Sequence, residues 1–537
     1  MAGKRKRGAE PVNGEAKKRA TGATPNNDPL SPITIQIITG SYERALHGFT
    51  ATIPRATLNS IQEEPQATLT DTSQKEQAST PEDSSTRVSF SDTFLFNAHR
   101  SSLTTLALSP LSPTTSKITL ATGSTDAQIQ LYSLSTSPPA PSSVSKPTLT
   151  PTPIHENPQN RELGTLQHHA STVTHLAFPT HGKLLSASLD NTIGVTRARD
   201  WTLLSSIKAP VPKAVGRPSG DTAAQGEVPA GVNAFAVHPS MKLCVSVGRG
   251  ERCMRLWNLV TGKKAGVLNF SRELLARAGE GKFGRGEGLS VVWDDEGEEF
   301  AVGFERGVVV YELDARPRST IIPSPRTKVG RLRYLPLENK HRKVLALSTE
   351  DGRVLFYDTT AAAILKDNAA QPQDGKDSGT DVEKTATFLG QLGGRTVGVS
   401  GRIKDFKVLV TPDATTHPQN KRLLIITASS DGAVRVWSAS HQELEVAGAE
   451  LENGEKEVEK TLENGAISAK VNGNTTSERQ IGKLLGTYET GHRITCLEAF
   501  IMSAPASVPE DSTREKEAWE GAESSSSDDD EEDDEEE

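Results

Sequence analysis

The chain has 537 residues, a formal net charge of -9 and hydrophobic residues at 34% of its positions. No apolar run reaches the roughly 18 residues that a membrane-spanning helix needs, and the basic N-terminal segment lacks the apolar core of a secretory signal. The three cysteines, Cys244, Cys253 and Cys496, have no CxxC or paired spacing, which argues against a disulfide framework and a zinc site. We therefore expect an intracellular protein in a reducing compartment that has no contact with a membrane.

One short pattern recurs along the chain. In LLIITASSDGAVRVW, residues 423–437, an apolar strand leads into a Ser-Ser-Asp-Gly turn and a second strand that ends in Trp437. An acidic residue recurs at the same offset, six residues before an aromatic or equivalent position, in six other places. Self-similarity at a fixed offset predicts one repeat in each blade of a propeller. The seven acidic residues are Glu43, Asp126, Asp190, Glu251, Glu305, Asp351 and Asp431.

The fold class predicted from this count is all-β, a seven-bladed β-propeller. Seven blades of roughly 40 to 45 residues need about 300 residues, and the surplus falls in polar, Pro/Ser-rich or charged segments. We expect one propeller over residues 31–502, between a basic disordered tail at 1–30 and an acidic disordered tail at 503–537. Insertions are expected at residues 54–92, 135–160, 209–230, 359–388 and 439–480.

The first and last apolar segments each supply only part of a blade. Residues 33–53 hold two strands around the turn at Glu43, and residues 494–502 hold one strand. Because unpaired strand edges promote aggregation, we expect the two ends to pair and close the ring, with residues 94–96 as an outer strand. The other repeats are predicted at residues 99–132, 169–196, 233–258, 289–314, 329–358 and 401–438.

The two tails carry opposite charge. Residues 1–30 contain the clusters KRKR at 4–7 and KKR at 17–19, which indicate a two-part nuclear import signal. The C-terminal tail ends in ten consecutive acidic residues, and a segment of this kind stays disordered. It is expected either to screen a basic partner or only to aid solubility. Three serines with Asp three positions later are candidate phosphorylation sites: Ser525, Ser526 and Ser527.

Several longer segments occur in a characteristic order. They are GSYERALHGF from residue 40, HHASTVTHLAF from 168, VNAFAVHPSMKLCVSVGR from 232, MRLWNLVTGK from 254, GRIKDF from 401 and TASSDGAVRVW from 427. Together they resemble the WD-repeat family of PAK-interacting proteins, and the resemblance covers all seven repeats. Its fungal members are nucleolar assembly factors of the large ribosomal subunit. The chain departs from the family in its insertions and in its acidic tail, where relatives often end in Lys-rich sequence.

The resemblance implies structural roles for the repeated residues. In WD-repeat families the turn acid accepts a hydrogen bond from a His before the same blade, which here implies such roles for His99, His169 and His492. Trp257 and Trp437 fill the aromatic position of the repeat. Catalytic carboxylate pairs occur once, in a pocket, whereas these acids recur in phase around a ring, so we predict no enzyme.

No metal or cofactor is predicted either. His168, His169 and His175 lack helical i, i+4 spacing and the acidic or cysteine residues that would complete a metal site. The letters GEGKFG at 279–284 match a dinucleotide fingerprint but follow the helix-like SRELLARA instead of a strand.

Basic residues are concentrated in the fourth and sixth repeats. One interpretation is a solvated surface, and the other is contact with RNA phosphates or an acidic partner. The candidate contact residues are Arg249, Arg252, Lys328, Arg331, Arg333, Arg342 and Lys343.

The resemblance, the import signal and the charge layout predict a monomeric, non-enzymatic scaffold for assembly of the large (60S) ribosomal subunit in the nucleus and nucleolus. Its expected partners are the pre-60S particle, assembly factors, a basic ribosomal-like protein and ribosomal RNA. The alternative implied by animal members is negative regulation of a p21-activated kinase by direct binding. A receptor of a cullin ubiquitin ligase usually shows Trp-Asp-x-Arg, whereas Asn258 follows Trp257 and Ser438 follows Trp437.

Overall fold

The computed structural model of the protein describes most of the chain between residues 32 and 503. The tails, with the expected import signal and Ser525, Ser526 and Ser527, lie outside the described residues. Within the described part, no helix is long and apolar enough to cross a membrane. The described residues are 32–59, 88–111, 116–139, 154–212, 230–281, 284–337, 339, 341–364, 384–399, 401–411, 422–444 and 479–503.

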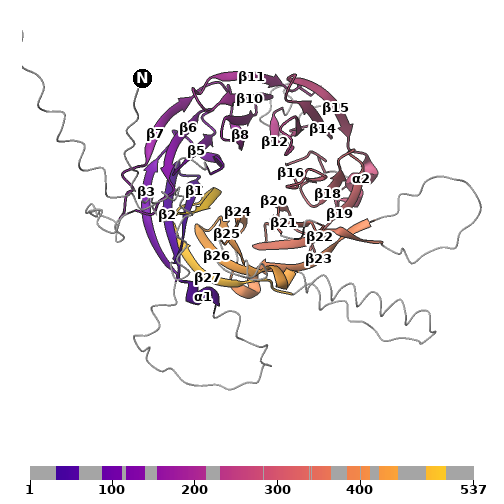
Figure 1. Ribbon diagram of the computed structural model, residues 1–537. Coiled ribbons are helices and arrows are strands. Elements are labelled where there is room, and N and C mark those ends of the chain that lie inside the picture. The colour runs from indigo at the N-terminus through magenta and orange to yellow at the C-terminus, as the bar shows by residue number, and fades with distance from the viewer. Residues whose placement is uncertain are drawn as a thin grey trace, which may run out of the picture. The chain divides into compact units, whose positions relative to one another are not determined.

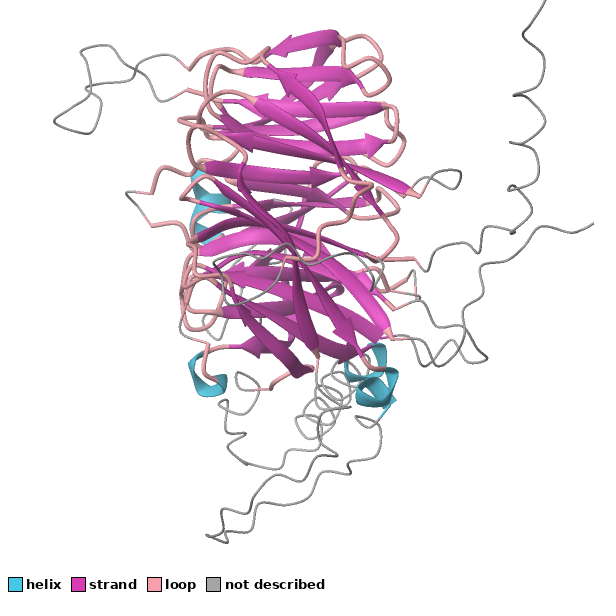
Figure 2. Ribbon diagram, turned by 90° about the vertical axis from the view of Figure 1, so that its left-hand side faces the viewer, coloured by secondary structure: helices cyan, strands magenta, loops and turns pink. Residues whose placement is uncertain are grey.

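Seven antiparallel blades of four strands stand around a central axis (Figure 1). Figure 2 shows the strands running across the thickness of the ring, with the loops gathered on its two faces. In every blade the innermost strand is followed by three strands that step outward. The outer strands of blades 5 and 6 also pair at Thr320 and Thr385, which joins these two blades into one eight-stranded sheet. The seven-bladed all-β propeller predicted from the turn acids is confirmed.

Blade 1 contains strands from both ends of the propeller, and blades 2 and 3 follow it along the chain. Blade 1 consists of β28 (Ile494–Ile501), β1 (Ile33–Ser41), β2 (Ala45–Ile53) and β3 (Ser89–Asn97). Blade 2 consists of β4 (Leu103–Leu108), β5 (Lys117–Ser124), β6 (Ile129–Ser135) and β7 (Arg161–Leu166). Blade 3 consists of β8 (Val173–Thr180), β9 (Lys183–Ser188), β10 (Thr192–Arg197) and β11 (Leu203–Lys208).

The other four blades follow in chain order. Blade 4 consists of β12 (Val232–Val237), β13 (Leu243–Gly248), β14 (Cys253–Asn258) and β15 (Lys263–Asn269). Blade 5 consists of β16 (Ser290–Trp293), β17 (Glu299–Gly303), β18 (Val308–Glu312) and β19 (Pro317–Ile321). Blade 6 consists of β20 (Val329–Tyr334), β21 (Val344–Thr349), β22 (Arg353–Ile364) and β23 (Lys384–Gly393). Blade 7 consists of β24 (Ile403–Val410), β25 (Arg422–Ser429), β26 (Ala433–Ser440) and β27 (Lys483–Glu489).

The core is a series of apolar layers, each between two neighbouring blades. One layer packs Ile193 of blade 3 against Phe235 and Trp257 of blade 4. A middle strand has such a layer on both of its faces, so it is apolar at successive positions, as in the fully buried run Leu423, Leu424, Ile425 and Ile426. This double burial explains why the second strand of a repeat stands out in the sequence.

The ring closes through pairing of strands from opposite ends of the chain. β28 lies antiparallel to β1, with Ile35 opposite Ile501 and Ile37 opposite Ala499. Across the neighbouring blade boundary, Tyr488 of β27 stacks on Phe49 of β2 with ring centroids 4.3 Å apart. Blade 1 therefore depends on residues from both ends of the propeller.

The structure differs from the sequence-based expectation in where the insertions belong. Those at 54–92, 135–160, 359–388 and 439–480 interrupt single blades between the third and fourth strands, and only 209–230 lies between two blades. The expected ranges also contain strand residues, because β3 begins at Ser89, β22 ends at Ile364 and β23 begins at Lys384. The outer strand expected at residues 94–96 lies within β3, whereas the other fourth strands were not predicted, because strands such as β7 and β11 are largely exposed and lack an alternating apolar pattern.

Short helices connect some of the strands. They are α1 (Arg55–Asn59), α2 (Arg272–Arg277) and the 3-10 turn Arg395–Val397. In α2 the Ser271 side chain accepts a hydrogen bond from the Leu274 backbone N–H, which caps the helix. Because α2 precedes the glycines at 279–284 and no strand leads into them, the strand, turn and helix of a dinucleotide site are absent there.

Candidate functional site

The seven repeated acids all lie in the turn between the second and third strands of a blade, from Glu43 between β1 and β2 to Asp431 between β25 and β26. In a four-stranded antiparallel blade, this turn and the link to the next blade lie at the same end of the strands. The turns and links together form one face of the ring, which we call the turn face. The connections between first and second and between third and fourth strands form the opposite face.

In blade 2 the turn acid binds a histidine. His99 Nδ1 lies 3.1 Å from Asp126 Oδ2, and His99 Nε2 lies 2.8 Å from Thr122 Oγ1. Asp126 also accepts a hydrogen bond from the Arg100 backbone N–H. Burial lowers the pKa of His99, although Asp126 partly opposes the change. This chain of hydrogen bonds ties the link before the blade to its central strands.

Blade 3 repeats the arrangement. His169 Nδ1 lies 3.2 Å from Asp190 Oδ2, and His169 Nε2 lies 2.8 Å from Ser186 Oγ. Burial alone would raise the pKa of Asp190, but hydrogen bonds from His169, Thr192 and the Ala170 backbone N–H hold it well below its usual range. The carboxylate is therefore charged and fully engaged in local bonds, which leaves it no role as a proton donor.

Other blades use arginine in place of histidine. Asp351 Oδ2 lies 2.8 Å from Arg353 Nε, and Asp431 Oδ2 lies 3.6 Å from Arg435 Nη2. Glu251 receives two hydrogen bonds from the Arg255 guanidinium. In each of these blades the acid and the arginine come from the same hairpin, so the pair stabilises the turn itself.

Glu43 and Glu305 have a third kind of partner. Glu305 Oε1 lies 2.8 Å from Lys328 Nζ, and Glu43 accepts a hydrogen bond from the Arg493 backbone N–H. The bond that the resemblance implies between His492 and a turn acid is not found among the described residues. The His492 backbone N–H instead donates to Thr490 Oγ1.

The aromatic residues of the repeat are buried and hydrogen-bonded. Trp257 Nε1 donates to Ser246 Oγ at 2.7 Å, and Trp437 Nε1 donates to Thr427 Oγ1 at 3.1 Å. In both blades the acceptor lies on the second strand, so the indole N–H links the third strand to the adjacent second strand of the same blade.

The three histidines that were considered for a metal site have different surroundings. His168 Nε2 and His169 Nε2 both contact Ser186 Oγ, whereas His175 lies in the central channel. The described residues contain no group of three His, Cys, Asp or Glu side chains that could hold a metal ion.

The structure separates the seven candidate contact residues into three groups. Arg249, Arg252 and Lys328 are exposed on the turn face, where the Arg252 guanidinium donates to the Arg285 and Gly284 carbonyls. Arg331 and Arg333 line the channel instead of an outer surface. The basic residues of the fourth and sixth repeats therefore lie in different parts of the fold and do not form one surface.

The last two candidates are neutralised on the opposite face. Arg342 Nε lies 2.7 Å from Asp358 Oδ2. Lys343 Nζ lies 2.5 Å from Asp294 Oδ2 and 2.8 Å from Glu298 Oε2. These ion pairs satisfy the charges within the fold, so Arg342 and Lys343 are poorly placed to bind RNA.

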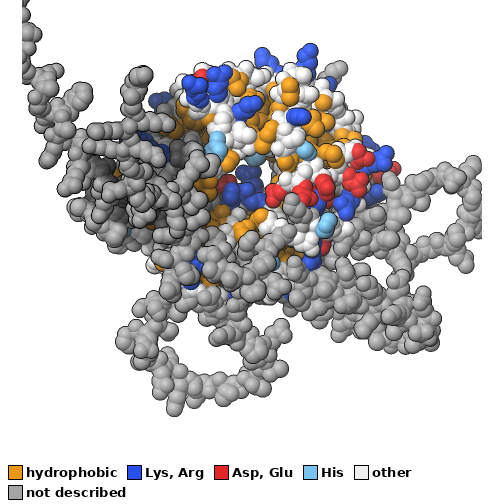
Figure 3. All heavy atoms as spheres, viewed as in Figure 1, with side chains coloured by type: hydrophobic (Ala, Val, Ile, Leu, Met, Phe, Trp, Pro, Cys, Tyr) orange, Lys and Arg blue, Asp and Glu red, His pale blue; other side chains and the backbone are white. Residues whose placement is uncertain are grey.

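A channel of about 640 Å³ runs inside the ring and is lined by the innermost strand of every blade. Figure 3 shows Lys and Arg side chains gathered in this hollow and acidic side chains beside it over blade 5. Arg333 Nη2 lies 3.5 Å from both Asp405 Oδ1 and Glu498 Oε1, and Lys407 Nζ lies 2.7 Å from Glu498 Oε2. The channel is thus a charged site in a molecule whose blades are otherwise held by apolar layers.

Comparison with known proteins agrees with this architecture. The model of the WD domain, G-beta repeat, matches residues 160–195, which include β7 to β9 and most of β10. Protein MAK11 of Saccharomyces cerevisiae is 26% identical over 427 residues, which cover 76% of this chain and 78% of MAK11.

The chain contains a WD repeat and is similar to MAK11 over most of its length. The p21-activated protein kinase-interacting protein 1-like of Danio rerio is 24% identical over 355 residues, 66% of this chain and 67% of the relative. The protein of the same name from Gallus gallus is 24% identical over 345 residues, 64% of this chain and 65% of the relative. The relationship to the WD-repeat family of PAK-interacting proteins, inferred from the quoted segments, is thereby confirmed.

Sequence reasoning missed the channel of this WD-repeat protein. Asp405 and Lys407 are two residues apart on β24, and Glu498 interrupts the apolar strand β28. A charged side chain in an otherwise apolar strand was the available signal, because such a residue must face a partner or water. The segment GRIKDF contains Asp405, but by itself it indicates only the family.

Proposed function

We propose that this WD-repeat protein is a non-enzymatic scaffold for assembly of the large ribosomal subunit in the nucleus and nucleolus. The observation that carries the proposal is the relationship to MAK11, which extends along 76% of the chain instead of being confined to one generic repeat. A propeller fold alone would not support it, since propellers serve many unrelated functions.

The charge of the turn face supports contact with a polyanion. Among the described residues of the turns and links that form this face, twelve Arg or Lys are exposed, against three exposed acids, Glu43, Glu273 and Asp431. Most of the repeated acids are instead engaged with neighbouring side chains, which leaves the basic side chains to dominate the surface potential. The twelve are Arg44, Arg100, Arg249, Arg252, Arg272, Arg285, Arg306, Arg326, Lys328, Arg395, Arg402 and Arg493.

The partners are therefore a pre-60S particle with its assembly factors, and ribosomal RNA at the turn face. A basic ribosomal-like protein is a further expected partner, through the acidic tail at 503–537. Phosphorylation of Ser525, Ser526 or Ser527 would add roughly 1.5 to 2 negative charges at each site and would strengthen that attraction.

The test is charge reversal on the turn face. Arg249 and Arg326 are exposed, and no side-chain partner is recorded for either within the described residues. The double variant Arg249→Glu, Arg326→Glu is expected to fold and to lose co-purification with the pre-60S particle. The slope of log affinity for ribosomal RNA against log salt should fall by about one unit for each phosphate that the variant no longer binds.

A matched control lies on the opposite face, where Arg199 and Lys242 are also exposed. Arg199→Glu with Lys242→Glu makes the same charge change and should leave particle association unchanged. Equal loss in both variants would assign the effect to net charge. Absence of ribosomal particles from the purified wild-type protein would contradict the proposal.

Regulation of a p21-activated kinase is the second candidate, because the Danio rerio and Gallus gallus relatives are named as interacting with such a kinase. It predicts direct binding of the purified protein to the kinase and a decrease in kinase activity. If the kinase is bound and no ribosomal particle is, this function replaces the first.

A further inference from the structure

The channel is lined by three basic residues, Arg331, Arg333 and Lys407, and by four acidic residues, Asp294, Asp295, Asp405 and Glu498. Arg333 and Lys407 share the carboxylates of Asp405 and Glu498, and Arg333 Nε donates to the Phe406 carbonyl at 2.5 Å. These bonds hold the Arg333 side chain against the wall between blades 6, 7 and 1. Arg331 takes part in none of these contacts.

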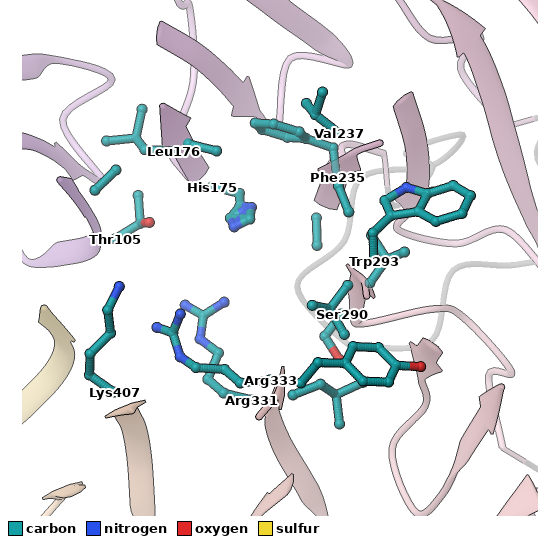
Figure 4. A pocket seen from close by; sticks show the side chains of 18 of the residues that line it. Thr105, His175, Leu176, Phe235, Val237, Ser290, Trp293, Arg331, Arg333 and Lys407 are labelled. Carbon is teal, nitrogen blue, oxygen red and sulfur yellow. The ribbon is translucent and has the colours of Figure 1, made fainter. Parts of the chain in front are cut away.

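Arg331 has no such partner. Its backbone N–H donates to Ser348 Oγ, but among the described residues no carboxylate or carbonyl is recorded as an acceptor for its guanidinium. Figure 4 shows the Arg331 side chain reaching into the channel beside Arg333, between Lys407 and His175. A guanidinium inside a protein is ordinarily paired, so this cation has unused capacity for two parallel hydrogen bonds.

His175 presents a second unused polar group from the opposite wall. Its ring packs on Phe235 with centroids 4.9 Å apart, and its buried Nδ1 has no hydrogen-bond partner in the described part of the chain. Burial, together with Arg331 and Arg333, lowers the pKa of His175 to about 3. The ring is therefore neutral at physiological pH and carries one N–H that can be donated.

Basic residues also lie at the turn-face end of β24. Lys404 follows the first residue of β24, and burial together with Arg402 and Arg493 lowers its pKa, although Glu350 partly opposes the change. These side chains add positive potential at that end of the blade.

We propose that the channel binds an oxoanion, a phosphate or a carboxylate group, through the Arg331 guanidinium and the His175 ring. The planar fork of Arg331 matches two oxygens of such a group, and the neutral ring donates a further hydrogen bond. The volume of about 640 Å³ admits a small phosphate compound or an acidic side chain with part of its peptide. This site is independent of the ribosomal role, because it is defined on the isolated protein.

The test is calorimetric titration of the full chain at constant ionic strength, with inorganic phosphate and with a short oligoglutamate peptide as probes. Saturable binding of either probe to the wild type supports the site, and the probe that binds identifies phosphate or polypeptide carboxylate as the source. Arg331→Gln should weaken binding at least about tenfold, as expected for loss of a charged pair of hydrogen bonds. Arg331→Lys should retain part of the affinity.

The matched control is Arg326→Gln, which makes the same change at an exposed arginine of the turn face and should bind as the wild type does. If neither probe saturates, or if Arg331→Gln binds equally well, the proposal is overturned. Should Arg331→Gln fail to fold, crystals of the wild-type protein soaked with tungstate decide the question. Anomalous density beside Arg331 supports the site, and its absence from the channel refutes it.

Discussion

Neighbouring blades are joined around the channel in two different ways. In blades 1 to 4, the second residue of the inner strand donates a side-chain hydrogen bond to a backbone carbonyl at the beginning of the next blade. We call this part of the ring the neutral arc. Its bonds are Thr495 Oγ1 to the Leu103 carbonyl, Thr104 Oγ1 to the Val173 carbonyl, Thr174 Oγ1 to the Val232 carbonyl and Asn233 Nδ2 to the Gly288 carbonyl.

Blades 6 and 7 carry Gly330 and Lys404 as the second residue of the inner strand, and blade 5 has Leu289 directly before β16. No such side-chain bond is recorded for these three residues within the described part of the chain. This part of the ring, the charged arc, is joined by ion pairs. Lys343 and Asp294 connect blades 5 and 6, Arg333 and Asp405 connect blades 6 and 7, and Lys407 and Glu498 connect blades 7 and 1.

The two arcs differ in how their contribution to stability responds to pH and salt. A neutral hydrogen bond contributes about 1 kcal/mol and responds little to pH or salt. Burial would raise the pKa of Glu498, but Lys407 and Arg333 hold it below its ordinary value. The stability that Glu498 contributes is therefore lost as the pH falls through this lowered pKa. The contribution of the charged arc to stability therefore depends on pH, whereas that of the neutral arc does not. The charged arc also borders the proposed anion site.

The largest expected effect comes from breaking the charged arc. Asp405→Ala removes the partner of Arg333 and the acceptor of the Leu497 backbone N–H, which lies 3.2 Å from Asp405 Oδ2. Loss of one partner from a buried pair should lower the free energy of unfolding by about 3 to 5 kcal/mol, measured by urea denaturation.

The control for this change is Glu350→Ala, which breaks the exposed pair of Glu350 and Arg402 at 3.3 Å. An exposed pair contributes at most about 1 kcal/mol. Equal losses in Asp405→Ala and Glu350→Ala would show that the channel pairs are no stronger than surface pairs, and the contrast between the arcs would fail.

A smaller effect is expected from His175, which faces the charged arc from the neutral arc. Its pKa of about 3 in the folded protein lies below the ordinary value of 6.5, so between these values the unfolded chain binds a proton that the folded chain does not. Stability should fall as the pH decreases through this window. His175→Gln should reduce that fall between pH 6.5 and 4.5 by about 1 to 2 kcal/mol.

Chemical denaturation across this pH range measures the effect of His175. The exposed His181 offers a matched substitution, His181→Gln, which should leave the pH dependence as it is in the wild type. An unchanged slope in His175→Gln would mean that the pKa of His175 is the same in the folded and the unfolded chain, and it would contradict the effect of burial on this ring.

The smallest effect is expected from the neutral arc. Thr174→Val keeps the shape of the side chain and removes the bond of 2.6 Å to the Val232 carbonyl, so the free energy of unfolding should fall by about 1 kcal/mol. The loss should be the same at low and high salt. Thr34→Val is the control, because no hydrogen bond of the Thr34 hydroxyl is recorded within the described residues. A loss above about 3 kcal/mol, or one that depends on salt, would contradict the neutral character of this arc.

The number of blades was determined by the sequence because each blade needs one tight turn between two buried strands. The acid of that turn recurs at a fixed offset, and runs such as Leu423 to Ile426 are apolar at every position because both of their faces are covered. The outer strands carry no comparable signal. In β11, Leu203–Lys208, one of six residues is buried, so the presence of this strand could not be predicted. For the same reason the sequence did not show that most insertions fall between the third and fourth strands of a blade.

Only the tertiary structure determined whether a basic residue is exposed or lines the channel. Arg249 and Arg331 looked equivalent in the sequence, yet a turn exposes the first and an inner strand directs the second into the channel. Alternation places Arg331 and Arg333 on one face of β20, but closure of the ring determines that this face borders the channel. The contact between Arg333 and Glu498 joins residues 165 positions apart, because the C-terminal strand β28 completes blade 1. A local pattern cannot encode such a pair, since its geometry exists only once all seven blades have packed together.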